Sequence, residues 1–384
     1  MLSTSVVRAG ALAACALTAH TAYNLRHLVS LTPDECHISE RVSILIPARN
    51  EQRTIEATVI DALIQRGLDD FEVLVLDDGS TDGTAEILAS IDNPHFRVIT
   101  APDEPPPAGW LGKPWACKRL AEQATGSVLV FLDADVRLDP HAVASAVQLL
   151  RARDLALVAP YPQIEAPTPL QKLVQPLMVW SWLTTVPLEV AERTQWSSFS
   201  AANGQFLIFD AQVYRRMGGH EAVRDEVLED INLMRAIRQA GEAALTVDAH
   251  AVASCAMYAT DTQMVDGYAK SLWSAFGGAL GSVVTNAGLM VTYVAPITGL
   301  MSRNGRTRTW AVIAYAAGVT GREIVAQRRG DPCLRSGSWE PLAHPASITA
   351  FSTLNALSWW RHVRGTNSWK GRSVVTKPHS RNDT

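Results

Sequence analysis

Apolar runs and amphipathic segments alternate through the middle of the chain. Each apolar run is short and almost continuous, which is typical of a strand that is buried on both faces of a parallel sheet. These runs span residues 42–47, 71–76, 96–100 and 127–132. The segments between them carry apolar residues at helical spacing, at 51–65, 84–91 and 114–124. Strands that alternate with helices in this way predict an α/β fold with a doubly wound, mostly parallel sheet.

Long stretches without Asp, Glu, Lys or Arg lie on both sides of this α/β part. They span residues 9–25, 271–302, 309–321 and 341–360. The first is flanked by Arg8 and Arg26 and is just long enough to cross a membrane as a helix. A cleaved signal peptide shows a similar pattern, but we favour an uncleaved N-terminal anchor because the segment that follows carries chemistry expected in the cytosol.

The three later stretches indicate a membrane-associated region near the C-terminus. Buried helices of a soluble domain are the alternative, above all for 309–321. Basic residues follow each stretch: Arg303, Arg306 and Arg308, then Arg328 and Arg329, then Arg361, Arg364, Lys370 and Arg372. Basic residues favour the cytoplasmic side, so three single crossings cannot place all three clusters there. An arrangement with 271–302 interfacial or re-entrant and a hairpin of the last two stretches is one solution, and the number of crossings stays open.

Composition narrows the classes of protein that fit. The 384 residues include 34 Lys and Arg against 38 Asp and Glu, a formal net charge of −4. A general nucleic-acid binder needs a basic face, so we expect no nucleic-acid partner. The apolar fraction of 47% excludes wholesale disorder. The five cysteines form no C-x-x-C pair, which argues against a disulfide framework or structural zinc site and favours a reducing, cytosol-facing compartment.

Polar residues follow three of the expected strands directly. Ligands of doubly wound sheets bind at the carboxyl ends of the strands, so these residues are candidates for a binding site. The three segments are 47–51 (Pro-Ala-Arg-Asn-Glu), 77–84 (Asp-Asp-Gly-Ser-Thr-Asp-Gly-Thr) and 133–135 (Asp-Ala-Asp). Their acidic character would repel a bare diphosphate, which implies a divalent cation if the ligand carries one.

The acidic positions have both a chemical and a structural interpretation. Asp133 and Asp135 lie two residues apart, so an extended backbone places both carboxylates on one side, where they can hold a hard cation. Strand-end turns also use Asp, and the Asp-Gly step after Asp78 is a common turn, although Asp78 can also accept hydrogen bonds from a nucleobase. Glu229 and Asp230 begin an expected helix. They either complement its dipole or supply a general base in Asp230, and the spacing alone does not decide.

Together, these motifs resemble the inverting family 2 glycosyltransferases of the GT-A fold. The resemblance rests on four segments in the family's order: 46–51 (Ile-Pro-Ala-Arg-Asn-Glu), 76–83 (Leu-Asp-Asp-Gly-Ser-Thr-Asp-Gly), 131–135 (Phe-Leu-Asp-Ala-Asp) and 228–230 (Leu-Glu-Asp). Residues 203–206 (Asn-Gly-Gln-Phe) look like the family's acceptor-side stretch. Residues 109–116 (Gly-Trp-Leu-Gly-Lys-Pro-Trp-Ala) and 368–372 (Ser-Trp-Lys-Gly-Arg) are similar to a narrower, membrane-bound branch associated with carotenoid and hopanoid pathways.

The resemblance implies a role for each matching residue. The residues that it assigns to the nucleotide sugar are Pro47, Ala48, Glu51, Asp78, Lys113 and Asp133. Asp133 and Asp135 would form the metal-binding pair, with Asp135 as the direct ligand of Mg²⁺ or Mn²⁺. Asp230 would be the catalytic base, with Glu229 beside it.

The implied reaction is the inverting transfer of a single hexose from a nucleotide sugar, most often a UDP-sugar, to a lipid or polyisoprenoid acceptor such as a carotenoid or hopanoid. Processive synthases of the family carry Q-x-x-R-W after the acidic helix, and this chain lacks that string, which favours a single transfer. Lys113 and Lys270 are either partners of the leaving group or surface lysines. The expected location is the cell membrane, with the catalytic domain facing the cytoplasm.

Two alternatives stay open: a polyprenyl-phosphate glycosyltransferase and a non-catalytic membrane scaffold with a GT-A fold. No P-loop, G-x-S-x-G elbow or H-E-x-x-H pair supports another class of enzyme. The expected organisation is an N-terminal membrane anchor and linker (1–40), a GT-A domain (41–262), a membrane-associated helical region (263–365) and a basic polar tail (366–384).

Overall fold

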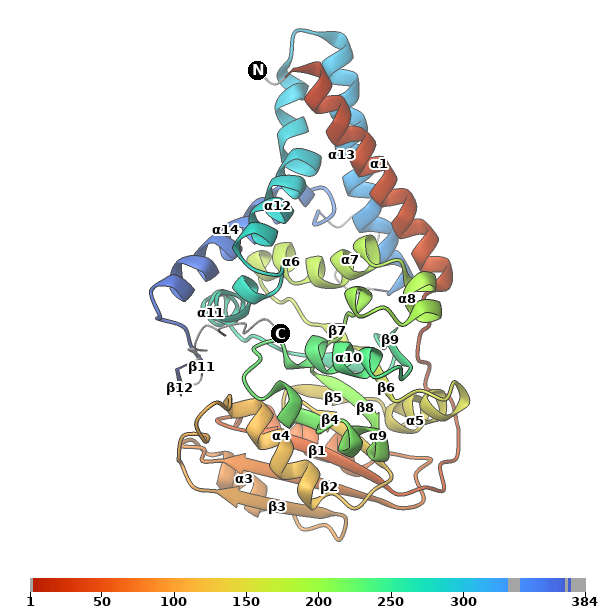
Figure 1. Ribbon diagram of the computed structural model, residues 1–384, viewed down its shortest axis with the longest axis vertical. Coiled ribbons are helices and arrows are strands. Elements are labelled where there is room, and N and C mark those ends of the chain that lie inside the picture. Colours follow the sequence, from red (N-terminus) through yellow and green to blue (C-terminus); the bar gives the residue numbers. More distant parts are fainter. Residues whose placement is uncertain (1–2, 331–338, 370–371, 374–384) are drawn as a thin grey trace, which may run out of the picture.

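The computed structural model describes residues 3–330, 339–369 and 372–373. A layered α/β part carries the central sheet, and a helical part rises from it and narrows to an apex (Figure 1). The first helix starts at this apex and runs toward the sheet (Figure 1). Lys370 and residues 374–384 of the expected basic tail lie outside the described residues.

A seven-stranded sheet forms the centre of the α/β part, in the order β3-β2-β1-β4-β8-β6-β9. Its strands are β1 (Val42–Ala48), β2 (Phe71–Asp78), β3 (Phe96–Ala101), β4 (Val128–Leu132), β6 (Leu157–Tyr161), β8 (Phe206–Asp210) and β9 (Ala244–Asp248). Among the described strands of this sheet, β8 alone runs antiparallel to its neighbours, β4 and β6. The prediction of a mostly parallel α/β sheet is confirmed.

Alternate side chains of the strands build a core on each face of the sheet. Ile44 and Ile46 of β1 pack with α2 (Ile55–Leu63) and α5 (Ala142–Ala152). Leu45 points to the opposite face, which α4 (Gly112–Gln123) and α10 (Glu229–Gln239) cover. The apolar run at β1 is continuous because both of its faces are buried.

Smaller elements complete the α/β part. They are α3 (Thr84–Ala89), α9 (Ala211–Arg216) and a small sheet of β5 (Val136–Leu138), β10 (Ala253–Cys255) and β7 (Gln163–Ile164). The helix expected at 51–65 begins only at Ile55. The preceding residues form a turn instead, because the backbone amides of Glu51 and Gln52 donate to side chains of the loop after β2.

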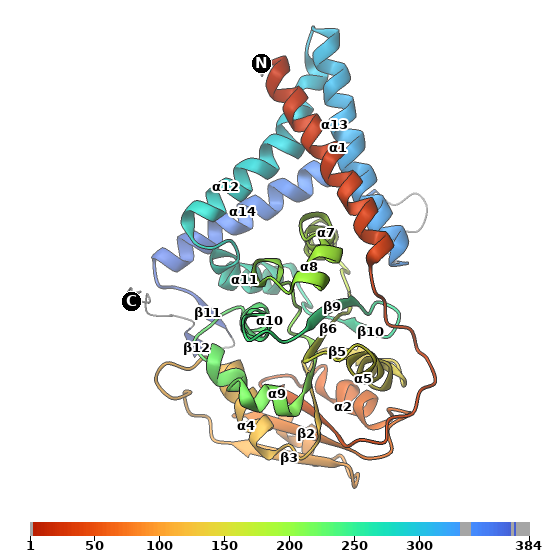
Figure 2. The same ribbon diagram turned by 45° about the vertical axis from the view of Figure 1, so that its right-hand side comes forward.

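The helical part joins segments that are distant in sequence. Helix α1 (Thr4–His27) lies along α13 (Gly305–Arg328) in both views (Figures 1 and 2). Residues Ala279–Met301, which comprise α12 (Ala279–Leu289), η4 (Met290–Val294) and η5 (Ala295–Met301), run up to the apex, and α13 runs back from it (Figure 2). Ala279–Met301 is the one described helix that is long and apolar enough to cross a membrane, with a mean hydropathy of 1.4.

The later charge-free stretches therefore pair differently from the arrangement considered above. The hairpin consists of Ala279–Met301 and α13, rather than of 309–321 and 341–360. Most of 341–360 lies in α14 (His344–Val363), which packs on α11 (Asp261–Ser271), where Ser358 Oγ donates to the carbonyl of Ala269 at 2.7 Å. Hydrogen bonds of this kind help to determine which helices pack together, and the positions of apolar residues in the sequence do not reveal them.

Three short helices lie between the sheet and the long helices: α6 (Pro169–Val174), α7 (Pro176–Thr185) and α8 (Leu188–Thr194). Trp180 and Trp182 of α7 are only 4% and 5% exposed, and Trp182 stacks on Tyr161 of β6. Both tryptophans are thus largely buried in the core of the helical part. At the end of α13, Arg329 Nε donates to Asp248 Oδ1 at 2.9 Å, which ties the helical part to β9.

Candidate active site

The loops after β1 and β2 are tied together at the carboxyl edge of the sheet. Asn50 has a positive φ of 54°, and its Oδ1 accepts a hydrogen bond from the amide of Thr81 at 2.8 Å. The amide of Glu51 donates to Thr84 Oγ1 at 2.8 Å. Ala48 ends β1 directly opposite Asp77 of β2. These contacts bring the segments 47–51 and 77–84 into one wall, as the rule for parallel sheets predicts.

Asp78 is held rigidly in this wall. Its side chain is 7% exposed, and Arg119 Nη2 of α4 donates to its Oδ1 at 2.6 Å. Arg49 Nη1 donates to the carbonyl oxygens of Asp78 and Gly79. No motif in the sequence singles out Arg119, because its link to Asp78 exists only once α4 lies on β2. The contact of Asp78 with a nucleobase stays a prediction.

Lys113 connects the end of β4 with the start of α10. Its Nζ lies 2.8 Å from Asp133 Oδ1, 3.1 Å from Glu229 Oε1 and 3.3 Å from the carbonyl oxygen of Gly204. Burial alone would lower the pKa of Lys113, but the carboxylates of Asp133 and Glu229 raise it well above its ordinary value. Lys113 is therefore a fixed positive charge inside the site rather than a surface lysine.

Gly204 lies close to both Asp230 and Lys113, which leaves little room for a side chain at this position. A Cβ at this position would lie 3.3 Å from Asp230 Cβ and 3.3 Å from Lys113 Nζ. A side chain here would therefore push the acid and the lysine apart. The stretch leads into β8, and the carbonyl of Gln205 accepts a hydrogen bond from the amide of Asp133 at 2.9 Å. The resemblance at 203–206 thus corresponds to a close approach of backbone to the acidic cluster.

Glu229 and Asp230 form the first turn of α10, and their environments move their pKa values in opposite directions. Burial and the negative charge of Glu229 raise the pKa of Asp230 to about 7. Burial would also raise the pKa of Glu229, but the charge of Lys113 holds it below its ordinary value. Lys270 of α11 also contributes to this lowering. Paired acids with separated pKa values are typical of sites where one of them exchanges a proton near neutral pH.

Asp133 and Asp135 lie between β4 and β5, where the loop turns out of the sheet. Among the described residues, no group of three or more His, Cys, Asp or Glu is arranged to hold a metal ion. Magnesium commonly takes only one or two carboxylates and completes its shell with substrate phosphates and water. The two carboxylates fit that role as a donor set. Cys255, which the sequence did not single out, lies beside them, and burial followed by the charge of Asp135 raises its pKa well above its ordinary value.

Four of the expected residues thus meet in one cluster: Lys113, Asp133, Glu229 and Asp230. The remaining ones, Pro47, Ala48, Glu51 and Asp78, lie at the neighbouring strand ends, and Asp135 follows β4. The charges of Lys113 and Lys270 both lower the pKa of Glu229. The individual roles of these residues stay predictions.

Comparison with known proteins identifies the domain. A family model described as "Glycosyl transferase family 2" matches residues 43–217, which run from β1 through β8 to the end of α9. The stretch 43–217 of this chain is thus similar to glycosyl transferase family 2. The resemblance of the motifs is therefore confirmed, and so is the class of enzyme. The matched stretch of this glycosyltransferase ends before Glu229 and Asp230.

Two curated relatives of this glycosyltransferase share one name with each other. A 4,4'-diaponeurosporenoate glycosyltransferase of Staphylococcus aureus is 26% identical over 369 residues, 91% of this chain and 92% of its own. The enzyme of that name from Staphylococcus haemolyticus is 24% identical over 298 residues, 74% of each chain. A solved mannosyltransferase from Pyrobaculum calidifontis, in complex with GDP-Man and Mn²⁺, is 18% identical with a TM-score of 0.51, covering 91% of this chain and 99% of its own. That likeness confirms the GT-A fold.

Proposed function

We propose that this glycosyltransferase transfers a single hexose, with inversion, from a nucleotide sugar, a UDP-sugar first of all, to a carotenoid-type lipid acceptor at a membrane. The observation that carries the proposal is the acidic pair at the start of α10, in which Asp230 has a pKa of about 7 and Glu229 stays ionised beside Lys113. The acceptor class is supported by the name of the relatives, which act on 4,4'-diaponeurosporenoate.

Asp230 acts as the general base when the acceptor is an alcohol. It takes the proton of the hydroxyl while the hydroxyl oxygen attacks the anomeric carbon. The new C–O bond forms as the bond to the diphosphate breaks, and the nucleoside diphosphate leaves with the electron pair. An acceptor carboxylate has no proton to give, so its transfer needs much less from Asp230.

Asp133, Asp135 and Lys113 would stabilise the leaving group. Asp133 and Asp135 would hold Mg²⁺ or Mn²⁺, which when bound offsets negative charge on the departing diphosphate. Lys113 Nζ, 2.8 Å from Asp133, adds a positive charge of the protein at the same edge. The loop at Asp78 and the end of β1 at Pro47 and Ala48 would orient the nucleotide.

The helical part would hold the enzyme at the membrane, with the α/β part facing the cytoplasm. Leu280, Val283 and Val284 of α12 are 78%, 65% and 62% exposed. A cluster of exposed aliphatic side chains on one helix is unusual for a protein surface in water and fits contact with lipid.

The arginines at the apex, Arg306 and Arg308, allow the topology to be tested. A cysteine placed at Arg306 is labelled from outside the cell if the hairpin crosses the membrane fully. It is labelled from the cytoplasm if the hairpin is re-entrant.

The proposal is tested with the full chain in detergent and a panel of UDP- and GDP-sugars. Each donor is combined with Mg²⁺ or Mn²⁺ and with 4,4'-diaponeurosporenoate or a hydroxylated carotenoid, and released nucleoside diphosphate and glycosylated lipid are measured. We expect one donor to give a glycosylated carotenoid. Release of nucleoside diphosphate with none of these donors, or a glycosyl phosphate product formed only from polyprenyl phosphate, would overturn the proposal.

A further inference from the structure

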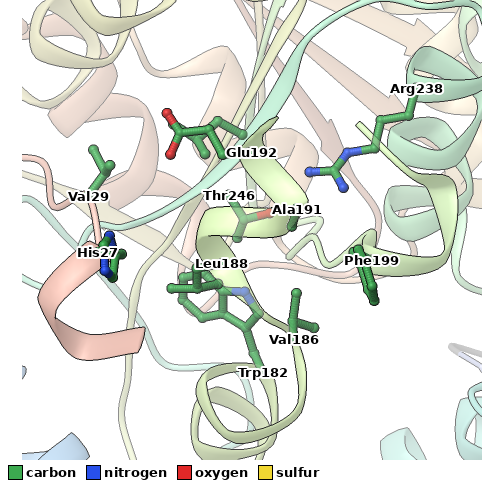
Figure 3. Close-up of a pocket in the computed structure, with 11 residues that line it drawn as sticks. His27, Val29, Trp182, Val186, Leu188, Ala191, Glu192, Phe199, Arg238 and Thr246 are labelled. Carbon is green, nitrogen blue, oxygen red and sulfur yellow. The ribbon is translucent and has the colours of Figure 1, made fainter. Parts of the chain in front are cut away.

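A pocket lies where the helical part meets the sheet, between the end of α1, α7, α8 and α10 (Figure 3). Its walls include the apolar side chains of Trp182, Val186, Leu188 and Phe199. The cavity is small, about 20 Å³, and it opens to solvent. No step of the proposed glycosyl transfer uses this pocket.

Arg238 of α10 places a guanidinium in this pocket, which His27, Glu192 and Thr246 also line (Figure 3). The residue is 6% exposed. Its Nη1 donates to the carbonyl of Trp196 at 3.2 Å and its Nη2 to the carbonyl of Ala244 at 3.1 Å. A guanidinium has five N–H donors, and Nε has no partner within the described part of the chain.

The charge of Arg238 has no counter-charge among the described residues. Burial lowers the pKa of its guanidinium, and no carboxylate offsets that effect. Glu192 also lines the pocket, but its Oε1 pairs with Arg153 Nη1 at 2.5 Å rather than with Arg238. Keeping a cation out of water without an anion costs several kcal/mol at order of magnitude. An anion that enters from outside would remove most of this cost.

Exposed aromatic rings adjoin the pocket on both sides. Tyr23, which is 44% exposed, contacts the ring of His27, and Trp196, which is 58% exposed, stacks on Phe199. His27 and Phe199 lie on opposite sides of the pocket (Figure 3). Exposed Tyr and Trp side chains are typical of the level of lipid headgroups in a bilayer. The charge, the apolar walls and the aromatic rim therefore point to one kind of occupant.

We propose that this pocket binds the anionic headgroup of a membrane lipid, with a phosphate or carboxylate oxygen hydrogen-bonded to Arg238 and the adjoining acyl carbons against Val186 and Leu188. Arg238 lies eight positions after Asp230 on the same helix, which is about 12 Å along its axis. The lipid would therefore not be the reacting acceptor. The inference uses the proposed membrane contact but not the transfer chemistry, and lipid retention is measured without turnover, so the two proposals can fail separately.

The test is native mass spectrometry of the full chain in detergent, with added phosphatidylglycerol or phosphatidylcholine. We expect the wild-type chain to retain one phosphatidylglycerol and no phosphatidylcholine. Arg238→Gln keeps a donor for a backbone carbonyl but removes the charge, so its affinity for phosphatidylglycerol should fall roughly tenfold or more. Arg193→Gln on α8 is the matched control, since that arginine is exposed, pairs with Glu189 and does not line the pocket, and this variant should retain the lipid.

A second variant keeps Arg238 and fills the apolar half of the pocket. Leu188→Trp should abolish lipid retention, and it carries the test if Arg238→Gln does not fold, as judged by thermal unfolding. Inorganic phosphate at millimolar concentration serves as the competitor. Displacement of the lipid by phosphate alone, equal retention of both lipids, or unchanged retention by either pocket variant would each overturn the proposal.

Discussion

Two cations on the same face of the sheet are stabilised in opposite ways. In the active site, Lys113 lies between the carboxylates of Asp133 and Glu229. At the junction with the helical part, Arg238 donates to two backbone carbonyls and to no carboxylate of the described chain. Both residues belong to helices that cover the same face of the sheet.

The difference does not arise from a lack of acids at the junction. Arg329 is buried there too, at 4% exposed, and its Nε lies 2.9 Å from Asp248 Oδ1. A buried cation in this region can therefore be given an internal partner, and Arg238 is the exception. We infer that internal pairs fix the geometry of the protein, whereas the unpaired cation leaves a position for a ligand.

The largest effect is expected in the active site. Asp230→Asn removes the base while keeping the size of the side chain, so kcat with an alcohol acceptor should fall by about 10²- to 10⁴-fold, with little change in donor affinity. Glu226, in the loop before α10, is exposed, and Glu226→Gln should leave the rate unchanged. Steady-state kinetics with both variants make this measurement. A rate for Asp230→Asn within threefold of the wild type would show that Asp230 is not the base.

Breaking the internal pair at the junction should have the next largest effect. Arg329→Met removes the guanidinium from the buried Asp248 and leaves His250 Nδ1, 2.7 Å from Asp248 Oδ2, as its closest remaining side-chain partner among the described residues, so the free energy of unfolding should fall by up to about 3–5 kcal/mol. Urea unfolding of the detergent-solubilised chain measures it. The exposed neighbour supplies the control, because Arg328→Met should change stability by less than about 0.5 kcal/mol. Equal unfolding midpoints for the two variants would mean that the pair does not tie the helices to the sheet.

Lys113 tests whether the active-site cation positions the acids. Lys113→Met leaves Asp133 and Glu229 facing each other without the charge between them, and kcat/KM for the donor should fall about 10- to 100-fold. Lys118→Met on the same helix is the control, since that lysine pairs with Glu122 in the next turn. Lys113→Met should also lower the free energy of unfolding. Adding Glu229→Gln should restore part of that loss, because the two side chains interact directly. Additive effects of the two substitutions would argue against the coupling.

The pH dependence of the rate tests the role of Asp230 as the base, with a smaller expected effect. Asp230 acts as a base only when it is deprotonated, and its pKa is raised to about 7. With an alcohol acceptor, the rate should therefore rise about tenfold from pH 6 to a plateau above pH 8. Transfer to a carboxylate acceptor should show a much flatter profile over that range. A rate that falls as the pH rises from 6 to 8 with an alcohol acceptor would exclude this role for Asp230.

The strand ends of the active site could be predicted from the sequence because local signals suffice there. A continuous apolar run marks a buried strand, and the polar residues that follow it, such as Asp133 and Asp135, must lie at the sheet edge. The partners of these residues could not be predicted. Lys113 reaches Glu229 only through the packing of α4 and α10 on one face of the sheet, and no periodicity encodes a contact across more than a hundred positions.

The helical part was harder to predict for the same reason. Charge-free stretches located most of its helices, but the hairpin partner of Ala279–Met301 is α13, where the sequence left a pairing of the last two stretches open. Arg238 carried no signal at all, since an arginine in the last turn of a helix is favoured by the dipole. Its burial depends on α8 and the loop at Trp196, which close over it.

The smallest effect on the protein alone is expected at Arg238, and this is what sets it apart from Arg329. Arg238→Gln loses one of the two carbonyl contacts but also removes the unpaired buried charge, and it leaves no buried carboxylate behind, so without lipid its stability should change by no more than about 1 kcal/mol. Added phosphatidylglycerol should then separate the two chains. At a lipid concentration 100 times its Kd the wild type gains about 2.7 kcal/mol, and the variant gains almost nothing. Urea unfolding with and without the lipid measures both terms. A loss as large as that of Arg329→Met in lipid-free detergent would mean that the two carbonyl contacts hold the junction by themselves, and that the charge of Arg238 needs no partner from the membrane.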